Sequence, residues 1–204
     1  MKTSALIIFT RNPVLGRVKT RLAKTIGKKK ALEIYRDLLR HTMTESQAID
    51  CDKYLFYDEE IIHNDNWSND IYKKRVQFGF DLGDKMQNAF ELLFKQGYRK
   101  CIIIGSDLFE LKSQHINDAF IKLECNEVVI GPAEDGGYYL LGLKKTTPSI
   151  FKNIDWGNAS VLTDTLKKLE NTKIDFLEML NDIDTIEDLE KSKYYQLHKI
   201  PKIE

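Results

Sequence analysis

The chain has 204 residues, of which 42% are apolar and 30% charged, with 31 basic against 31 acidic side chains. This composition is typical of a globular chain, and its length fits one domain over residues 1–204. No run approaches the roughly 20 apolar residues of a membrane helix. The apolar stretch at 5–9 is too short for a signal peptide, and three widely spaced cysteines indicate neither disulfides nor a zinc site, so we expect a cytoplasmic protein.

Short apolar runs alternate with amphipathic segments along the chain. Strands are expected at 5–9, 53–57, 75–78, 100–105, 127–131 and 138–143. Helices are expected at 28–47, 83–96, 113–124, 158–170 and 185–196. This alternation predicts an α/β fold with a mostly parallel central sheet and helices on both faces. Ligands of such sheets bind beyond the carboxyl ends of the strands, so the residues that follow each strand are the site candidates.

The segment RNPVLGRVKTRL (11–22) follows the first expected strand and contains four cations and no acid. Pro13 and Gly16 are turn residues, and glycine lets the backbone pass close to a ligand. Lys19 and Arg21 could converge on one phosphate from a loop or a first helical turn. The fingerprints GxxxxGK[ST] and GxGxxG are both absent. An anion site and a solvated basic surface therefore both remain open.

The run IIIGSDLFEL (102–111) places Asp107 at the end of a buried strand. A carboxylate there could hold Mg²⁺, which takes one or two protein carboxylates and completes its shell with phosphate and water oxygens. Alternatively, Ser106 or Asp107 caps the next turn or helix.

Two further acidic segments follow later strands. In GPAEDGG (131–137), Asp135 could orient a hydroxyl or act as a general base, although Asp-Gly-Gly is also an ordinary hairpin turn. In NDIDTIEDL (181–189), Asp182 or Asp184 could share a metal with Asp107. Equally, Asp184 or Thr185 could only cap the last helix, since Thr185 with Asp188 resembles a capping box.

Charge is unevenly distributed along this neutral chain. Residues 11–30 hold eight bases and no acid, and residues 178–190 hold six acids and no base. This polarity favours local anion and cation binding over a broad nucleic-acid surface. An RNA-binding module is the non-enzymatic alternative, but no aromatic residues are interleaved with the cations to stack on bases.

Six segments in this order resemble a bacterial family of small glycosyltransferases in the nucleotide-diphospho-sugar transferase superfamily. They are FTRNPVLGRVKTRL, QFGFDLGDKMQNAF, IIIGSDLFEL, GPAEDGGYYLLGL, IDWGNASVLTDT and DIDTIEDL, spanning about residues 4 to 190. More distantly, KTRL and DIDTIEDL are similar to segments of 2-phospholactate guanylyltransferase and the molybdenum-cofactor nucleotidyltransferases. The resemblance implies a GT-A-like fold with its site along the carboxyl edge of the sheet.

The resemblance also implies roles for particular residues. Those expected at the nucleotide are Arg11, Gly16, Lys19, Arg21, Gln77, Asp81, Gly83 and Ser106. Those expected at the sugar or acceptor are Asp135, Gly136, Gly137 and Trp156. Asp107 and Asp184 are the expected ligands of Mg²⁺ or Mn²⁺, and catalysis is expected from Asp135, Lys19 and Arg21.

The function that follows is a metal-dependent transfer of a glycosyl group from a nucleotide-sugar to a small-molecule acceptor. The alternative is a nucleotidyltransferase, which joins an NTP to a small phosphorylated or carboxylate metabolite and releases pyrophosphate. A nucleic-acid partner and a membrane span are not expected. Nothing in the sequence indicates an oligomeric state.

Overall fold

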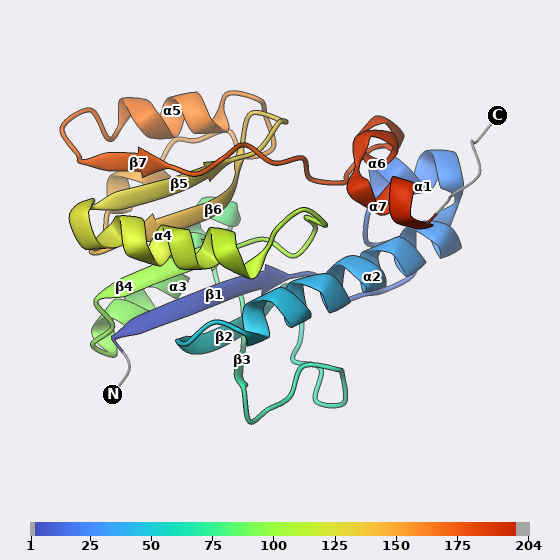
Figure 1. Ribbon diagram of the computed structural model, residues 1–204, viewed down its shortest axis with the longest axis horizontal. Helices are drawn as coiled ribbons and strands as arrows, with labels where there is room; N and C mark the ends of the chain where they lie inside the picture. The colour runs from blue at the N-terminus through green and yellow to red at the C-terminus, as the bar shows by residue number, and fades with distance from the viewer. Residues whose placement is uncertain (1–2, 199–204) are drawn as a thin grey trace.

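A single seven-stranded sheet organises the computed structural model, which describes residues 3–198 (Figure 1). The strands are β1 (Ser4–Thr10), β2 (Asp52–Tyr57), β3 (Tyr72–Val76), β4 (Lys100–Ile104), β5 (Val128–Pro132), β6 (Tyr138–Leu143) and β7 (Ile174–Phe176). Their order across the sheet is β3-β2-β1-β4-β6-β5-β7, and only β6 runs antiparallel to its neighbours. The expected α/β fold with a mostly parallel sheet is confirmed.

Helices cover both faces of the sheet. They are α1 (Thr20–Ile26), α2 (Lys28–Gln47), α3 (Leu82–Lys95), α4 (Ser113–Cys125), α5 (Val161–Lys167), α6 (Ile186–Lys191) and α7 (Lys193–His198), with a 3₁₀ turn at Pro148–Phe151. Apolar side chains of α2 and α4 bury one face, and those of α3, α5 and the 3₁₀ turn bury the other. Central strands such as β1 are apolar almost throughout because both of their faces are covered.

Several element boundaries differ from the predictions. Strand β3 lies at Tyr72–Val76 instead of 75–78. The charged residues Lys73–Arg75 at its centre do not form an apolar run, so the start of this edge strand was not recognised. Lys74 is nevertheless buried, and it forms an ion pair with Asp65. Strand β7 and helix α1 were not predicted at all, and the expected helix 158–170 covers only Val161–Lys167. The expected helix 185–196 is two short helices, since Ser192 between them has an extended backbone.

The basic and acidic ends of the chain meet in space. Helices α6 and α7 lie beside α1 and α2 at one end of the molecule (Figure 1). A small core joins them, made of Leu22, Ile34, Leu38, Ile183, Leu189 and Tyr194. This packing carries the acidic segment 178–190 to the carboxyl edge of the sheet, where the basic segment begins. Within residues 3–198, none of the helices has the length and apolar character needed to cross a membrane.

Candidate functional site

Two adjoining cavities lie at the carboxyl edge of the sheet. The first has a volume of about 570 Å³ and is here called the cationic cleft after its basic side chains, Arg11, Lys19, Arg21 and Lys85. Four acidic residues also line it, namely Asp58, Asp81, Asp107 and Asp184. The second, the acidic pocket, has a volume of about 210 Å³ and is lined by Asp107, Asp135, Asp182 and several aromatic and apolar side chains. Asp107 lines both cavities and marks their junction.

Lys19 has an unusual backbone. Its φ of 47° and ψ of 46° lie in the left-handed region, where a side chain with a Cβ costs roughly 1–2 kcal/mol. The residue stands at the N-cap of α1, and its side chain is only 4% exposed. The Lys19 Nζ donates a hydrogen bond of 3.0 Å to the Asp107 Oδ2. Strained residues of this kind persist where the surrounding structure holds them, which is common at functional sites.

The Asp107 carboxyl is held in its ionised form. Burial by itself would raise its pKa, but the Lys19 ammonium and the Arg11 guanidinium offset that effect and lower the pKa below its usual value. The helix that follows, α4, has Lys112 at its N-cap, so Asp107 does not cap it. The side chain is still 40% exposed toward the cavities. A carboxylate oxygen therefore remains accessible for a ligand.

The second expected pair of charges also meets. The Arg21 Nη1 donates to the Asp184 Oδ2 at 3.0 Å, with the Arg21 side chain 68% exposed. Helix α6 is capped by Thr185 and Asp188 in the expected capping box, so the Asp184 side chain is left to face the cleft. Each cation of the KTR segment is thus paired with a carboxylate that sequence analysis assigned to a metal.

Three other expected nucleotide residues line the cationic cleft. The Gln77 Nε2 donates to the carbonyls of Thr10 and Phe56, both at 3.1 Å, and so ties together the ends of β1 and β2. The Asp81 Oδ1 accepts from the Asp84 backbone N–H at 2.8 Å as the N-cap of α3. Ser106 is buried, with its hydroxyl 3.5 Å from the Tyr35 hydroxyl. These side chains have structural partners as well as a place in the cleft.

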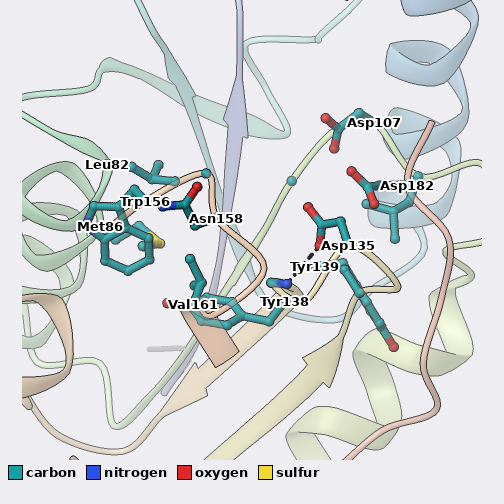
Figure 2. Close-up of a pocket in the computed structure, with 15 residues that line it drawn as sticks. Leu82, Met86, Asp107, Asp135, Tyr138, Tyr139, Trp156, Asn158, Val161 and Asp182 are labelled. Carbon is teal, nitrogen blue, oxygen red and sulfur yellow. Dashed lines mark hydrogen bonds between the residues drawn. The ribbon is translucent and has the colours of Figure 1, made fainter. Parts of the chain in front are cut away.

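In the acidic pocket, three carboxylates gather opposite an apolar and aromatic wall (Figure 2). Asp135 belongs to the turn between β5 and β6, and its Oδ1 accepts from the Gly137 backbone N–H at 2.8 Å. The Asp-Gly-Gly segment is therefore a hairpin turn between β5 and β6, and Asp135 within it lines the pocket.

Asp182 is brought to this cluster by backbone contacts of the extended segment that precedes α6. The Ile183 N–H donates to the Asp107 carbonyl at 3.3 Å, and the Leu180 N–H donates to the Pro132 carbonyl at 3.1 Å. Burial, together with the carboxylates of Asp107 and Asp135, raises the pKa of Asp182 to about 7. This carboxyl is therefore poised to gain or lose a proton near neutral pH.

The opposite wall of the acidic pocket is built around Trp156. Its ring meets the Tyr138 ring edge to face, with centroids 6.4 Å apart. The Trp156 Nε1 is buried against Gly83, and the buried Tyr138 hydroxyl interacts with Thr165, so neither polar atom is exposed to the pocket. This wall therefore presents aromatic and apolar surface to the pocket.

Three of the expected glycines do not line either cavity. A Cβ on Gly83 would lie 2.6 Å from the Trp156 Nε1, and one on Gly136 would lie 2.2 Å from the Ala159 carbonyl oxygen. Gly16 has a φ of 78° in the turn before α1. These glycines shape the walls and the turn, whereas Gly137 lines the acidic pocket.

The carboxylates have the chemistry of a magnesium or manganese site. Among residues 3–198, no group of three or more His, Cys, Asp or Glu side chains is placed to hold a metal by itself. Mg²⁺ commonly uses only one or two carboxylates plus phosphate and water oxygens, however, so the donor set fits a metal bound together with a phosphate ligand.

Sequence reasoning leaves two residues of this arrangement unassigned. Asp182 and Asp184 are both candidates from their spacing, and the family resemblance implies Asp184, so Asp182 has no role assigned to it. The Tyr35 hydroxyl accepts from the Arg11 N–H at 2.8 Å and links the ends of β1 and β4 through Ser106. Tyr35 lies on the apolar face of α2, so its sequence position signals only a core residue.

The chain is similar to known proteins. A family described as "Uncharacterized protein conserved in bacteria (DUF2064)" matches residues 42–158. No curated protein matches the chain at a significant level. A crystal structure from Desulfovibrio desulfuricans G20, described as a "putative nucleotide-diphospho-sugar transferase", is 29% identical with a TM-score of 0.88, and the match covers 98% of this chain and 95% of that one.

More distant structures share the fold. The 4-diphosphocytidyl-2C-methyl-D-erythritol synthase of Anaerococcus prevotii DSM 20548 is 11% identical with a TM-score of 0.61, over 96% of each chain. A homologue of Rv0371c from Mycobacterium sp. strain JC1 is 10% identical with a TM-score of 0.61, over 97% of this chain and 98% of that one. At these identities the likeness concerns architecture alone.

Proposed function

This chain belongs to the bacterial family DUF2064, and on that premise we propose that it transfers a glycosyl group from a nucleotide-activated sugar to a small-molecule acceptor. The observation that carries the proposal is the position of Asp107 between a cation-lined cleft and an acidic pocket with an aromatic wall. The basic side chains of the first cavity would bind a nucleoside diphosphate, and the carboxylates and aromatic wall of the second would bind a sugar. The name of the 29%-identical structure from Desulfovibrio supports the same class of donor.

The cations of the cleft would bind the diphosphate. Arg11 and Arg21 can form bidentate hydrogen bonds to phosphate, and Lys19 supplies a compact charge beside Asp107. Lys19 and Arg21 are engaged by Asp107 and Asp184. Diphosphate binding would draw both cations away from these acids, and they would then stabilise the charge that develops on the leaving diphosphate.

Mg²⁺ or Mn²⁺ would be held by Asp107 with one further carboxylate. The mutual electrostatic effect of Asp107 and Asp182 supports Asp182 for that place, because a cation between two carboxylates relieves their repulsion. Asp184, the ligand expected from the family resemblance, is engaged with Arg21 and stays a prediction. A bound metal would supply neutralisation of phosphate charge.

Asp135 would then be the general base. Its Oδ1 is fixed by the Gly137 N–H, so the carboxylate faces the pocket in which an acceptor hydroxyl would lie. In the transfer, the acceptor oxygen bonds to the anomeric carbon as the bond from that carbon to the nucleotide diphosphate breaks. The electron pair goes to the diphosphate, and the hydroxyl proton goes to Asp135.

Nucleotidyl transfer is the second candidate. The chain shares its fold with a cytidylyltransferase-type enzyme solved with CTP, CMP:2-keto-3-deoxy-manno-octonic acid synthetase, at a TM-score of 0.55 and 10% identity. In that reaction a metabolite phosphate or carboxylate would attack the α-phosphorus of an NTP and release pyrophosphate. The attacking group is already an anion, so Asp135 would only bind.

One panel separates the two reactions. The protein is incubated with Mg²⁺ or Mn²⁺ and either nucleotide-sugars or NTPs, with thermal shift for binding and separate assays for nucleoside diphosphate and pyrophosphate. We expect nucleotide-sugars to stabilise the protein, and the Lys19→Ala, Arg21→Ala double variant to lose that effect. Stabilisation by NTPs alone, with pyrophosphate released on turnover, would contradict glycosyl transfer.

A further inference from the structure

A third cavity shares Thr10 and Arg11 with the cationic cleft. It has a volume of about 340 Å³ and is enclosed by the end of β1, helix α2 and the connection between β2 and β3. Three guanidinium side chains line it, those of Arg11, Arg36 and Arg40, and we call it the arginine cavity. Arg36 and Arg40 are four residues apart on α2 and so lie on one face of that helix.

The charge of these arginines is only partly compensated, because Arg11 lies near enough to Asp107 to lower the pKa of that carboxyl and Arg36 has no acidic partner in the described part of the chain. Among residues 3–198, no hydrogen bond or ion pair engages the guanidinium group of Arg11 or Arg36. Arg40 pairs with Asp37, which does not line the cavity. Three like charges around one cavity repel one another, and an anion bound among them would relieve that repulsion.

The one acidic side chain in the cavity wall is already neutralised. Asp65 accepts from the Lys74 Nζ at 2.6 Å, and the Lys74 side chain is only 5% exposed. The Tyr57 hydroxyl also donates to Asp65, and burial raises the pKa of this phenol, so that it keeps its proton. The carboxylate of Asp65 is therefore committed to Lys74 and Tyr57 and does not pair with the three arginines.

The rest of the cavity suits a small organic anion. Leu39, Met43 and Trp67 give it an apolar floor, and its volume falls at the lower end of the range for small-molecule sites. Arginine forks match the oxygens of phosphate and carboxylate groups bidentately.

We propose that the arginine cavity is a second anion-binding site, which takes a small metabolite through a phosphate or carboxylate group. The site adjoins the cationic cleft at Thr10 and Arg11, but Arg36 and Arg40 do not line that cleft. The proposal does not depend on the transfer reaction, because it rests only on the three arginine side chains and the shape of the arginine cavity.

Calorimetric titration with two probes tests this site. Inorganic phosphate and citrate are titrated separately into the full chain at constant ionic strength, which distinguishes a phosphate ligand from a carboxylate one. The test variant is Arg36→Gln, Arg40→Gln. The control is Lys24→Gln, Lys29→Gln, which removes the same charge from exposed residues that line neither this cavity nor the cationic cleft. Circular dichroism and thermal melting establish that each variant is folded.

We expect the arginine variant to bind at least one of the two anions at least about tenfold more weakly than the wild type, while the lysine control changes by less than about twofold. Wild-type binding of neither probe would overturn the proposal. An arginine variant that binds both anions as tightly as the wild type would also overturn it. An equal loss of affinity in the lysine control would overturn it too, because binding would then reflect the general charge of the surface.

Discussion

Asp182 is the residue whose chemistry is most altered by its surroundings in the candidate site. Its carboxyl is partly buried and faces Asp107 and Asp135, and its pKa is raised to about 7. A carboxylic acid that titrates near neutral pH is costly to keep ionised in the fold, and such groups are concentrated at functional sites. The cost should therefore be measurable in the stability of the protein.

We predict that Asp182→Asn stabilises the protein at pH 8. Because the folded pKa lies above the unfolded value of about 4, the folded state binds this proton more tightly. The contribution of the wild-type carboxyl to the free energy of unfolding then falls as the pH rises from about 4 to about 7. After a discount for partial exposure, the gain in the variant at pH 8 should be on the order of 1–2 kcal/mol.

Urea unfolding at pH 5 and pH 8 without divalent cations measures this effect. The gain should be smaller at pH 5, where the wild-type carboxyl is mostly protonated. Asp70→Asn, on an exposed loop, serves as the matched control and should change little at either pH. An Asp182→Asn variant that is less stable than the wild type at pH 8 would refute the raised pKa.

At this scale the sequence identified most of the charged residues but not their partners. Asp107 and Lys19 were both predicted at the site, and their 3.0 Å contact joins positions 88 residues apart. Which of Asp182 and Asp184 lies nearer to Asp107 depends on how the backbone around the buried Ile183 is oriented. That orientation follows from the backbone hydrogen bond between Ile183 and Asp107, a tertiary contact that residue spacing does not encode.

Helix α1 is the element that most directly shapes the site, and it begins at a left-handed residue. The turn that contains Gly16 leads to Lys19, whose positive φ directs its buried side chain to Asp107. Lys19 makes no side-chain capping bond to the helix. The position of Lys19 is therefore maintained against a local backbone preference.

We predict that Lys19→Gly is more stable than Lys19→Ala by about 1 kcal/mol, because glycine adopts a positive φ without a Cβ clash. Both variants lose the ion pair with Asp107, so each is the control for the other. The difference between their free energies of unfolding therefore reports the backbone preference at position 19. Urea unfolding of the two variants gives the comparison. Equal stability, or a more stable alanine variant, would mean that Lys19 is not left-handed in solution.

Strong periodicity was the reliable signal for the other elements. Helix α2 spans the predicted residues 28–47 because its apolar face is long and uninterrupted. Short elements held by tertiary contacts were missed or misplaced. Strand β7 has three residues and pairs only with the edge of β5, and Ser192 divides the last helix by an extended backbone.

In the whole molecule, the basic and acidic segments that lie far apart in the sequence are neighbours in space. The basic segment after β1 and the acidic segment before α6 meet at the carboxyl edge of the sheet, joined by the Arg21–Asp184 ion pair and the core that contains Leu22 and Leu189. A chain with no net charge thus concentrates both signs around one pair of cavities. The charges are thus gathered at one edge of the sheet, which is the arrangement that the proposed binding of a cation and an anion requires.

The central claim is that Asp107 joins a metal and a nucleoside diphosphate between the two cavities. The most direct test is calorimetric titration of UDP, GDP, CDP and ADP with and without Mg²⁺ or Mn²⁺, on wild type, Asp107→Asn and the Asp70→Asn control. We predict that the metal strengthens binding of at least one diphosphate about tenfold or more in the wild type and the control, and that Asp107→Asn loses this dependence. Metal-dependent binding that persists undiminished in Asp107→Asn, or the absence of diphosphate binding to the wild type, would contradict the claim.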